Sequence, residues 1–446
     1  MAQEFRSINR RGFLGLVSAG FAFPTIVPAK VFGRGGSPSA NEKIQVGVIG
    51  LGSRGFDLLR QVMNHQDFSR VVSICDVDSL HYRDLTWGKS KAYGRQPATQ
   101  FVEKTYGSAK ELQVCSDFRE VTGRNDIDAV VVATPDHWHA LCTLSALKNG
   151  KDVYCEKPVT HTFHEGQLVY REVAKQKAIF QTGSQQRSEK EFRRAAELVR
   201  NGHLGKITHV EVGLAPGYEK PMGETTIKQP PETLDYDMWC GPAPVLPYMR
   251  ARHHRWWRGH RAFGGGYMDW IGHHNDIAHW ALNLDHSGPV EIKATGWTFP
   301  TPEIYNTPFE YEIQCQYADG LTTSIASRYP VGIRFVGESG WLHVTRGKLR
   351  ASDSRWLADS FDVGANRVYL STDHMRNFFD CIRSRKPCIC PAETAHRSIT
   401  PGHLGYVSNQ LGVALKWNPV EERFVDHDEA NRILMENPYR SPWTLV

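Results

Sequence analysis

The sequence predicts an α/β protein of two domains, the first built on a parallel sheet and the second on a mainly antiparallel one. Residues 44–49 form an apolar run that leads directly into a glycine-rich loop and then a helical pattern. Residues 127–133 and 153–155 are apolar on both faces, as buried parallel strands are. From residue 290 onward, short runs alternate polar and apolar side chains, which is typical of antiparallel strands with one covered face.

Length and composition exclude several classes of protein. The chain has 446 residues, too many for one ordinary core, and its 40% hydrophobic and 23% charged residues are typical of a globular protein. No apolar run is long enough to span a bilayer. The net charge of +5, without a basic stripe interleaved with aromatic residues, does not indicate a nucleic-acid partner. The nine cysteines are odd in number and several lie in apolar runs, so we expect buried thiols rather than a disulfide framework.

Residues 1–32 resemble a twin-arginine export signal. Arg10 and Arg11 stand directly before an apolar segment, residues 13–27, and Val27-Pro28-Ala29 supplies a small-residue cleavage site. A disordered basic N-terminus is the alternative. We therefore expect the chain to meet the twin-arginine export machinery, which carries folded proteins, and to reside in the periplasm or another extracytoplasmic space.

The first strand, residues 44–49, runs into the sequence Gly50-Leu51-Gly52-Ser53-Arg54-Gly55, and a helical pattern follows at residues 56–62. Strand, glycines and helix in this order are the context that a dinucleotide-binding loop requires. Gly50 permits the tight turn, Gly52 lets the backbone approach a pyrophosphate, and Gly55 permits close packing of the helix. The N-terminus of the helix then offers its free N–H groups to the phosphates.

The second strand, residues 70–75, ends at Asp76, which lies about 20 residues after the glycine loop, as the dinucleotide fingerprint requires. A carboxylate at this point accepts hydrogen bonds from the ribose hydroxyls and repels a 2′-phosphate, so we expect NAD rather than NADP. Arg54 acts in the opposite direction, because a guanidinium can accommodate that phosphate. The alternative for Asp76 is an ordinary turn aspartate.

The third strand, residues 127–133, is followed by Thr134-Pro135-Asp136-His137-Trp138-His139, at the edge where parallel sheets bind their ligands. His137 and His139 suggest a zinc site, but no third ligand follows at metal spacing, so we predict no metal. A helical pattern at residues 140–148 then leads to the strand at residues 153–155.

That strand ends in Glu156-Lys157-Pro158. Lys157 therefore lies just past the carboxyl end of a parallel strand, at the same ligand-binding edge. A lysine in such a place is most often a solvated side chain. Its role depends on the rest of the chain.

The glycine loop, Asp76, the run from Ala133 to His139 and Glu156-Lys157-Pro158, in this order and spacing, resemble the Gfo/Idh/MocA oxidoreductases. The resemblance covers about residues 43–420. It implies a Rossmann domain, a C-terminal α/β domain with a large open sheet that often mediates homo-oligomers, and hydride transfer between a nicotinamide cofactor and a carbohydrate or cyclitol carbon. It also implies the cofactor contacts, which are Gly50, Gly52, Ser53, Arg54, Gly55, Asp76, Pro135, Asp136, His139, Glu156 and Lys157.

Residues 33–42 are rich in Gly, Ser and Pro and form the predicted tether, residues 43–187 the first domain, and residues 188–446 the second. Gln185, Gln186 and Arg187 would enter the cleft between the domains, where amide and guanidinium donors suit sugar hydroxyls. A solvated loop is the alternative for these residues.

The second domain begins with a helix at residues 188–201 and a strand at residues 209–214. Residues 215–246 are rich in Pro and Gly, and we expect them to wrap the surface of the domain. Further strands and helices are expected at residues 291–296, 309–317, 321–326, 332–337, 340–344, 374–383 and 396–415.

A helix at about residues 269–282 carries the candidate catalytic groups. Oxidation of an alcohol requires a base, and imidazole suits that task near neutral pH. Asp269 and His273 are i and i+4 on one helix face, and they match the acid/base motif of the resembled family. By this resemblance His273 takes the hydroxyl proton, Lys157 holds the same oxygen, and Asp269 orients the group. His274 competes with His273, because adjacent residues point about 100° apart on a helix.

We therefore predict an exported, NAD-dependent oxidoreductase that acts on a sugar or sugar derivative. Trp257 suits packing against a pyranose ring, with core packing as its alternative. Because free nicotinamide is absent outside the cytoplasm, we expect tightly held NAD and a redox-neutral cycle. The rivals are a glycoside hydrolase that oxidises its substrate transiently and a non-catalytic periplasmic sugar-binding protein; Lys157, Asp269 and His273 argue against the latter.

Overall fold

The computed structural model describes residues 42–83, 90–301 and 304–445. The predicted export signal and nearly all of the predicted tether lie outside the described residues. No helix within the described ranges is long and apolar enough to cross a bilayer.

The first sheet has six strands, all parallel, in the order β5-β2-β1-β6-β7-β8. Its strands are β1 (Ile44–Ile49), β2 (Ser69–Cys75), β5 (Gln113–Cys115), β6 (Ala129–Val132), β7 (Asp152–Cys155) and β8 (Phe180–Thr182). The strand order reverses between β1 and β6, so the ligand crevice of such a sheet opens at the carboxyl ends of these two strands. The glycine loop directly follows β1.

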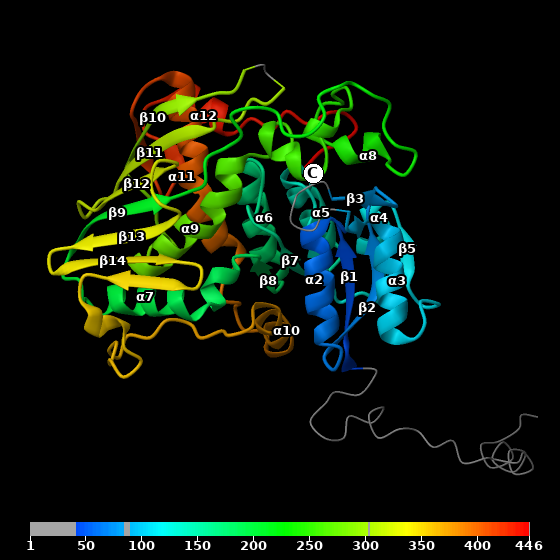
Figure 1. The fold of residues 1–446 in the computed structure, drawn as a ribbon, viewed down its shortest axis with the longest axis horizontal. Helices are drawn as coiled ribbons and strands as arrows, with labels where there is room; N and C mark the ends of the chain where they lie inside the picture. The colour runs from blue at the N-terminus through cyan, green and yellow to red at the C-terminus, as the bar shows by residue number, and fades with distance from the viewer. Residues whose placement is uncertain (1–41, 84–89, 302–303, 446) are drawn as a thin grey trace, which may run out of the picture. The chain divides into compact units, whose positions relative to one another are not determined.

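Helices connect these strands on both faces of the sheet, as parallel pairing requires (Figure 1). They are α2 (Ser53–Asn64), α3 (Arg95–Tyr106), α4 (Phe118–Thr122), α5 (Asp136–Lys148) and α6 (Phe163–Gln176). A two-stranded ribbon, β3 (His81–Tyr82) with β4 (Ala92–Tyr93), follows β2. The domain is thus the predicted doubly wound α/β layer.

The second sheet has nine strands in the order β15-β14-β13-β9-β12-β11-β10-β16-β17. All neighbouring strands are antiparallel except β9 with β12, so the prediction of a mainly antiparallel sheet is confirmed. Its strands are β9 (Ile207–Gly213), β10 (Glu291–Thr298), β11 (Glu310–Gln316), β12 (Thr322–Ala326), β13 (Gly332–Gly337), β14 (Gly340–Thr345), β15 (Lys348–Ala351), β16 (Leu415–Asn418) and β17 (Arg423–Phe424).

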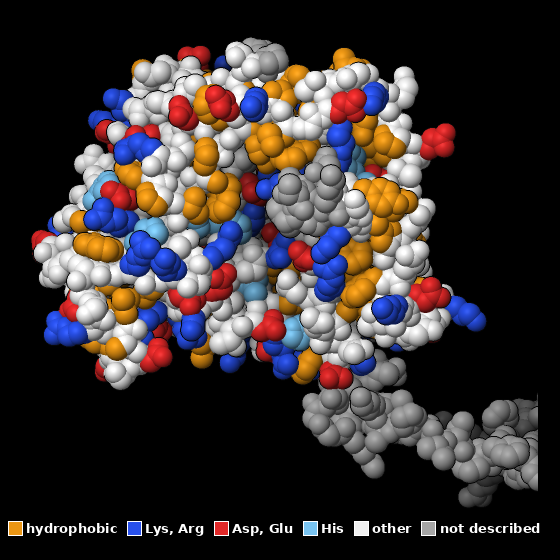
Figure 2. Space-filling model, viewed as in Figure 1, with side chains coloured by type: hydrophobic (Ala, Val, Ile, Leu, Met, Phe, Trp, Pro, Cys, Tyr) orange, Lys and Arg blue, Asp and Glu red, His pale blue; other side chains and the backbone are white. Residues whose placement is uncertain are grey.

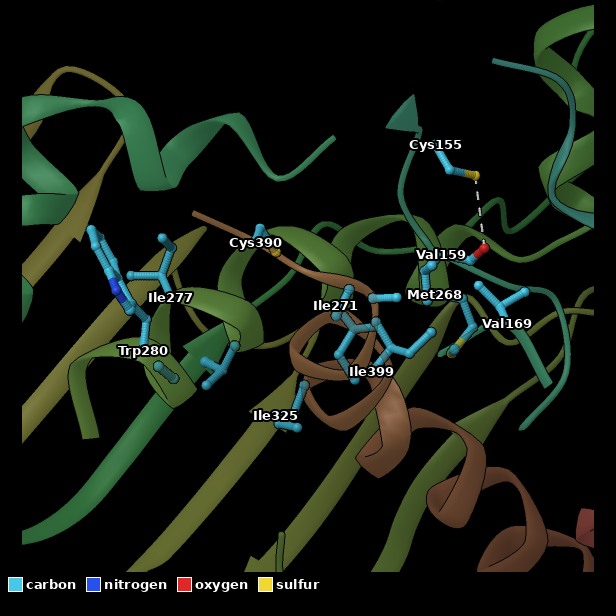
Figure 3. Close-up of a cluster of buried hydrophobic side chains, with 14 of the residues drawn as sticks. Cys155, Val159, Val169, Met268, Ile271, Ile277, Trp280, Ile325, Cys390 and Ile399 are labelled. Atoms are coloured by element: carbon cyan, nitrogen blue, oxygen red, sulfur yellow. Dashed lines mark hydrogen bonds between the residues drawn. The ribbon is translucent and has the colours of Figure 1, made fainter. Parts of the chain in front are cut away.

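Three helices pack against the second sheet. They are α7 (Lys190–Arg200), α9 (Gly266–Leu282) and α11 (Ala392–Leu411). A continuous apolar core joins them to both domains: Figure 3 shows Val169 of α6, Ile271 of α9, Ile399 of α11 and Ile325 of β12 in one cluster. This packing holds α9, which carries the candidate catalytic residues, against the carboxyl end of β7.

The last third of the chain departs from the prediction in two places. The helix expected at residues 374–383 to close the second domain is α10 (His374–Ser384), and Phe378 and Phe379 bury it in the core of the first domain instead. The helix expected at residues 396–415 is α11, which ends at Leu411 because Gly412 adopts a left-handed conformation with φ of 69°. The remaining described elements are short: α8 (Tyr236–Cys240), α12 (Asp428–Leu434), η3 (Gln185–Ser188), η4 (Arg250–Arg252), η5 (His254–Gly259) and η6 (Ser354–Leu357).

We expected the insertion at residues 215–246 to wrap the surface of the second domain. It also contacts the first domain. Its α8 region pairs with the loop after β2, where Ser79 N donates to Thr233 O (2.8 Å) and Asp235 N donates to Val77 O (3.0 Å). Apolar side chains of the insertion and of the segment after it form a separate buried cluster, which includes Leu234, Trp239, Tyr248, Trp257 and Phe263. The insertion therefore reaches across to the nucleotide-binding edge of the first sheet.

All nine cysteines are buried and free, so the prediction of buried thiols is confirmed.

Glu165 is a buried carboxyl group from which we expect a pH dependence of the stability of the fold. Its carboxylate is fully buried at the start of α6, where it accepts hydrogen bonds from the backbone N–H groups of His161 (2.8 Å) and Thr162 (2.9 Å) and from the Tyr439 hydroxyl. Burial outweighs these bonds and raises the pKa of Glu165 to about 7. The unfolded chain, with an ordinary pKa, ionises first as the pH rises.

We therefore expect the free energy of unfolding to fall as the pH rises from about 4.5 to about 7, by up to about 3 kcal/mol, since one pKa unit corresponds to about 1.4 kcal/mol. Glu165→Gln keeps the shape of the side chain and should remove this loss. Urea unfolding at pH 5 and pH 8 measures it, with exposed Glu421→Gln as the control. An equal loss in the wild type and Glu165→Gln would show that other groups cause it.

Candidate active site

Lys157 and Asp269 form the centre of the site. Lys157 follows β7, and its Nζ donates to Asp269 Oδ1 (2.6 Å) and to the Asp269 carbonyl oxygen (3.2 Å). Their side chains are only 10% and 17% exposed. The two residues come from different domains, so this ion pair also joins the first sheet to α9.

Arg258, which sequence reasoning did not select, is a second cation on the same carboxylate. Its Nη2 donates to Asp269 Oδ1 (3.2 Å), and its guanidinium lies 4.1 Å from the centre of the Trp257 ring. Burial alone would raise the pKa of Asp269, but Arg258 and Lys157 outweigh it and hold that pKa well below its ordinary value. Asp269 is therefore a permanent anion between two cations.

His273 and His274 take different directions from α9. His273 lines the same cavity as Lys157 and Asp269, and its Nδ1 lies 2.7 Å from the side-chain amide of Gln186. His274 is fully buried, and its Nδ1 contacts the carbonyl oxygen of Gly213 in β9 (2.8 Å). The structure thus places His273, and not His274, beside the ion pair, and His274 does not line the cavity where we expected it to contact substrate.

The glycine loop has the geometry of a phosphate cradle. Gly50 has a φ of 87°, and a Cβ there would lie 2.6 Å from the Ala133 carbonyl oxygen; a Cβ on Gly55 would lie 1.8 Å from the Gly50 carbonyl oxygen. Gly52, by contrast, faces open space, with no atom within 4 Å of an added Cβ. It also precedes α2 without a side-chain cap, so the first N–H groups of the helix are left for a ligand. These features fit a dinucleotide pyrophosphate.

Asp76 is held rigidly at the end of β2. Its Oδ2 accepts a hydrogen bond from Leu51 N (2.5 Å) and its Oδ1 from Asp78 N (2.8 Å). Burial raises the pKa of Asp76, and neighbouring His81 and these N–H groups offset part of that rise. The carboxylate lines the cavity and keeps free lone pairs, as binding to ribose hydroxyls requires.

Arg54 points away from Asp76. Its Nε donates to Glu156 Oε1 (2.7 Å) at the end of β7, and β1 and β6 separate that strand from β2. The expectation that Arg54 offsets the preference for NAD is therefore wrong, because its guanidinium is engaged at the other end of the cavity. Gln185 shares the same carboxylate, since its Nε2 donates to Glu156 Oε1 (3.0 Å).

The motif after β6 lines the cavity through Pro135, Asp136 and His139. His139 contacts two backbone carbonyls, that of Pro158 through Nδ1 (2.7 Å) and that of Thr134 through Nε2 (3.0 Å). It thereby joins the loop after β6 to the loop that carries Lys157. Burial raises the pKa of Asp136 well above its ordinary value, and Arg258 offsets this rise only in part.

Arg187 lies away from the site, which corrects the expectation that it contacts substrate. It is 1% exposed, its Nε donates to Asp276 Oδ2 (2.7 Å), and its Nη2 donates to Asp285 Oδ1 (2.9 Å). Two carboxylates compensate the buried guanidinium, and the ion pair with Asp276 joins η3 to α9. Trp257 combines both of its alternatives, because it lines the cavity and belongs to a packed apolar cluster.

The suggested histidine pair is engaged by backbone carbonyls, while one other cluster among the described residues could hold a metal ion. In the suggested pair, the ring nitrogens of His137 contact the carbonyls of Phe263 (3.2 Å) and Trp239 (3.0 Å), and those of His139 are similarly engaged. Asp78, His81 and His254 form a second cluster, which the sequence did not reveal. The rings of His81 and His254 stack at 3.4 Å with 19° between their planes, so a metal in the plane of one ring would lie far off the plane of the other.

These residues surround a cavity of about 430 Å³. The cavity extends from Asp76, past the glycine loop, to Lys157 and His273, and residues of and near the insertion cover it, among them Met238, Trp239, Arg250, His254 and Trp257. Figure 2 shows basic and acidic side chains around a hollow at the junction of the two halves of the described chain. An extended ligand with a phosphate-bearing centre fits this arrangement.

Two family profiles match the chain. "Oxidoreductase family, NAD-binding Rossmann fold" matches residues 44–184, and "Oxidoreductase family, C-terminal alpha/beta domain" matches residues 188–445. Among curated relatives, inositol 2-dehydrogenase from Burkholderia cenocepacia (strain HI2424) is 30% identical over 164 residues, which are 36% of this chain and 43% of that protein. The alignment thus spans less than half of the relative.

Solved structures share the fold. The WlbA dehydrogenase from Bordetella pertussis, in complex with NADH and UDP-GlcNAcA, is 18% identical with a TM-score of 0.59, and the match covers 84% of this chain and 99% of that one. The aldose-aldose oxidoreductase from Caulobacter crescentus gives the same values. A myo-inositol dehydrogenase from Lactobacillus casei, in complex with NAD(H) and myo-inositol, is 16% identical with a TM-score of 0.56, covering 84% and 97%. At these identities the likeness establishes the fold alone.

Proposed function

Since the chain belongs to the Gfo/Idh/MocA family of oxidoreductases with an NAD-binding Rossmann domain, we propose that it interconverts a secondary alcohol and a ketone on a carbohydrate or cyclitol. The observation that carries this proposal is the contact of Lys157 with Asp269, beside His273, in the same cavity as the glycine loop and Asp76. Bound NAD would accept or supply the hydride at this end of the cavity.

The residues of this site have different proposed roles in binding the cofactor and the substrate. Gly50, Gly52 and the N-terminus of α2 would hold the pyrophosphate, and Asp76 the ribose hydroxyls. Lys157 and His273 would bind the substrate oxygen, which changes between hydroxyl and carbonyl. Asp269 keeps Lys157 in place and balances its charge. The insertion contributes Met238 and Trp239 to the lining of the cavity.

A polyhydroxylated substrate is supported by two arguments. The inositol 2-dehydrogenases among the relatives act on a cyclitol by name. In the cavity, Trp257 lies beside the Arg258, Lys157 and His273 donors, and such a combination of an aromatic ring with donors suits the C–H and O–H groups of a sugar ring.

Export and retention of the cofactor form the second part of the proposal. Arg10 and Arg11 before an apolar segment support passage through the twin-arginine machinery to the periplasm or another extracytoplasmic space. The cover formed by the insertion supports slow release of NAD. A redox-neutral cycle follows, in which a second substrate or the same bound one reoxidises the cofactor. The implied homo-oligomer stays a prediction.

Product analysis tests the proposed activity. The purified protein with added NAD is incubated with cyclitols, free aldoses, nucleotide sugars and glycosides, and reduced nicotinamide and keto products are measured. We expect a keto sugar or keto cyclitol in step with reduced cofactor. Release of an aglycone without net reduction would identify the rival glycoside hydrolase, and sugar binding without either product would identify a binding protein.

A further inference from the structure

Arg346 lines the cavity from the turn between β14 and β15. The side-chain amide of Gln186 lies between it and His273: one polar atom of the amide is 2.7 Å from His273 Nδ1, and the other is 3.2 and 3.1 Å from Nε and Nη2 of Arg346. The amide therefore bridges the guanidinium and the ring of His273. A single sugar molecule could contact both Arg346 and the proposed site of the reacting oxygen, at His273 and Lys157.

Two contacts hold the Arg346 guanidinium in place. A guanidinium can only donate hydrogen bonds, so the atom of Gln186 that faces it is the amide oxygen, which accepts from Nε and Nη2. Gln186 belongs to η3 and is 1% exposed, so this acceptor is fixed by its surroundings. The guanidinium also lies 5.2 Å from the centre of the Trp270 ring. Although Arg346 is exposed, these contacts reduce the freedom that its side chain would lose on binding a ligand.

One end of the guanidinium is left for a ligand. The contact with Gln186 uses the side formed by Nε and Nη2. No described residue accepts a hydrogen bond from Nη1, and no described carboxylate forms an ion pair with Arg346; Glu189 is affected by its charge without pairing with it. Nη1 and the second N–H of Nη2 can thus donate in parallel to the two oxygens of a carboxylate.

The charges at this end of the cavity favour an anion. Three cations surround Asp269 and His273, namely Lys157, Arg258 and Arg346. Glu156 is already paired with Arg54, and burial raises the pKa of Asp136 well above its ordinary value. Even with Asp136 ionised, the described carboxylates that line this end of the cavity leave one positive charge without a partner. The ring of oxidised nicotinamide would add another positive charge.

We propose that Arg346 is a specificity residue that binds a carboxylate of the substrate, so that the protein acts on a sugar acid, such as a uronate, in preference to the neutral sugar. This inference rests on the proposed function, because it concerns the same molecule whose alcohol is oxidised. A carboxylate matches the fork of Nη1 and Nη2, whereas a hydroxyl oxygen gains no charge-assisted pair there. The carboxylate is bound and stays unchanged in the reaction.

Titration calorimetry tests the site without requiring turnover. D-glucuronate and D-galacturonate are titrated into the NAD-loaded protein and compared with their uronamides, which keep the shape of the acid but carry no charge. We expect each acid to bind about 10- to 100-fold more tightly than its amide, the range for hydrogen bonds to a charged group. Arg346→Met should remove this difference, and Arg346→Lys, which keeps the charge but not the fork, should retain part of it. Exposed Arg350→Met, in β15, is the control and should keep all of it.

Three results of this titration would overturn the proposal. The first is a wild type that binds the acids no better than the amides, or that binds neither. The second is a preference for the acids that persists in Arg346→Met. The third is an affinity for D-glucose 6-phosphate that depends on Arg346 and exceeds the affinity for both uronates, because the site would then select a phosphate.

Kinetics separate recognition of the substrate from a structural role of Arg346. If Arg346 only supports Gln186, and His273 through it, Arg346→Met should lower kcat/KM by the same factor for D-glucuronate and for D-glucose. We expect instead that the ratio of kcat/KM for the acid to that for the neutral sugar falls by about 10- to 100-fold. An equal loss for both sugars would make Arg346 a structural residue and overturn the proposal.

Failure of the inference and failure of the proposed function give different results. If neutral sugars reduce NAD and uronates are not preferred, only the role of Arg346 is wrong. If neither sugars nor sugar acids reduce NAD, but the uronates bind through Arg346, the proposed oxidoreductase function fails and the carboxylate site stands.

Discussion

Lys157→Met is expected to lower kcat by about 10²- to 10³-fold, the range for loss of one donor to an oxygen on which charge develops. The side chain is 10% exposed and its Nζ is 2.6 Å from Asp269 Oδ1, so methionine removes the amine but keeps most of the volume. Affinity for NAD should change little, because the glycine loop and Asp76 lie elsewhere in the cavity. Stopped-flow measurement of nicotinamide reduction and titration with NAD separate the two effects.

Lys157→Arg sharpens this prediction. Arginine restores the positive charge beside Asp269 and can still donate hydrogen bonds to the substrate oxygen. We expect it to recover part of the activity that methionine loses, while exposed Lys148→Met, in the last turn of α5, should match the wild type. A Lys157→Arg variant as slow as Lys157→Met would show that a positively charged donor at position 157 is not sufficient.

Asp76→Ala is expected to raise the Kd for NAD by about 10- to 100-fold, since hydrogen bonds to a charged group contribute about 1.5–3 kcal/mol. The variant also loses the charge that repels a 2′-phosphate, so the ratio of the Kd for NADP to that for NAD should fall. Isothermal titration with both cofactors measures the ratio. Because Asp76 accepts hydrogen bonds from Leu51 N and Asp78 N, thermal unfolding must show that the loop is intact.

Asp67→Ala is the matched control, because Asp67 is an exposed aspartate of the same domain. It should leave both constants unchanged. A ratio in Asp76→Ala equal to that of the wild type would show that Asp76 does not select the cofactor. Arg54 is not expected to compensate, since it is paired with Glu156.

The site residues that could be predicted from the sequence are those that follow a recognisable pattern within one helix, strand or loop. The glycine loop and Asp76 stand at fixed positions after strands, and Lys157 follows an apolar run that is typical of a buried parallel strand. Asp269 and His273 have helical spacing. In each case the feature depends on one element and its end, and the structure places these residues in one cavity.

The residues that sequence could not reveal depend on contacts between elements. Arg258 reaches Asp269 from a 3₁₀ helix, and Arg346 reaches Gln186 from a hairpin turn, with no spacing that links either pair. We expected Arg187 to be free to contact substrate, because a charged loop residue is usually exposed. In the structure it is buried and paired with Asp276 and Asp285, which are distant in the sequence. The choice between His273 and His274 depended on the rotation of α9, which packing against the second sheet determines.

The measurement that tests the account most directly is the absorbance of the purified, mature protein without added cofactor, before and after a panel of cyclitols, sugars and glycosides. The account predicts that NAD co-purifies and that addition of one sugar produces the near-ultraviolet absorbance band of reduced nicotinamide. The Lys157→Met variant should still contain NAD but should show no such band. A protein that carries no NAD and reduces none when it is supplied would contradict the account.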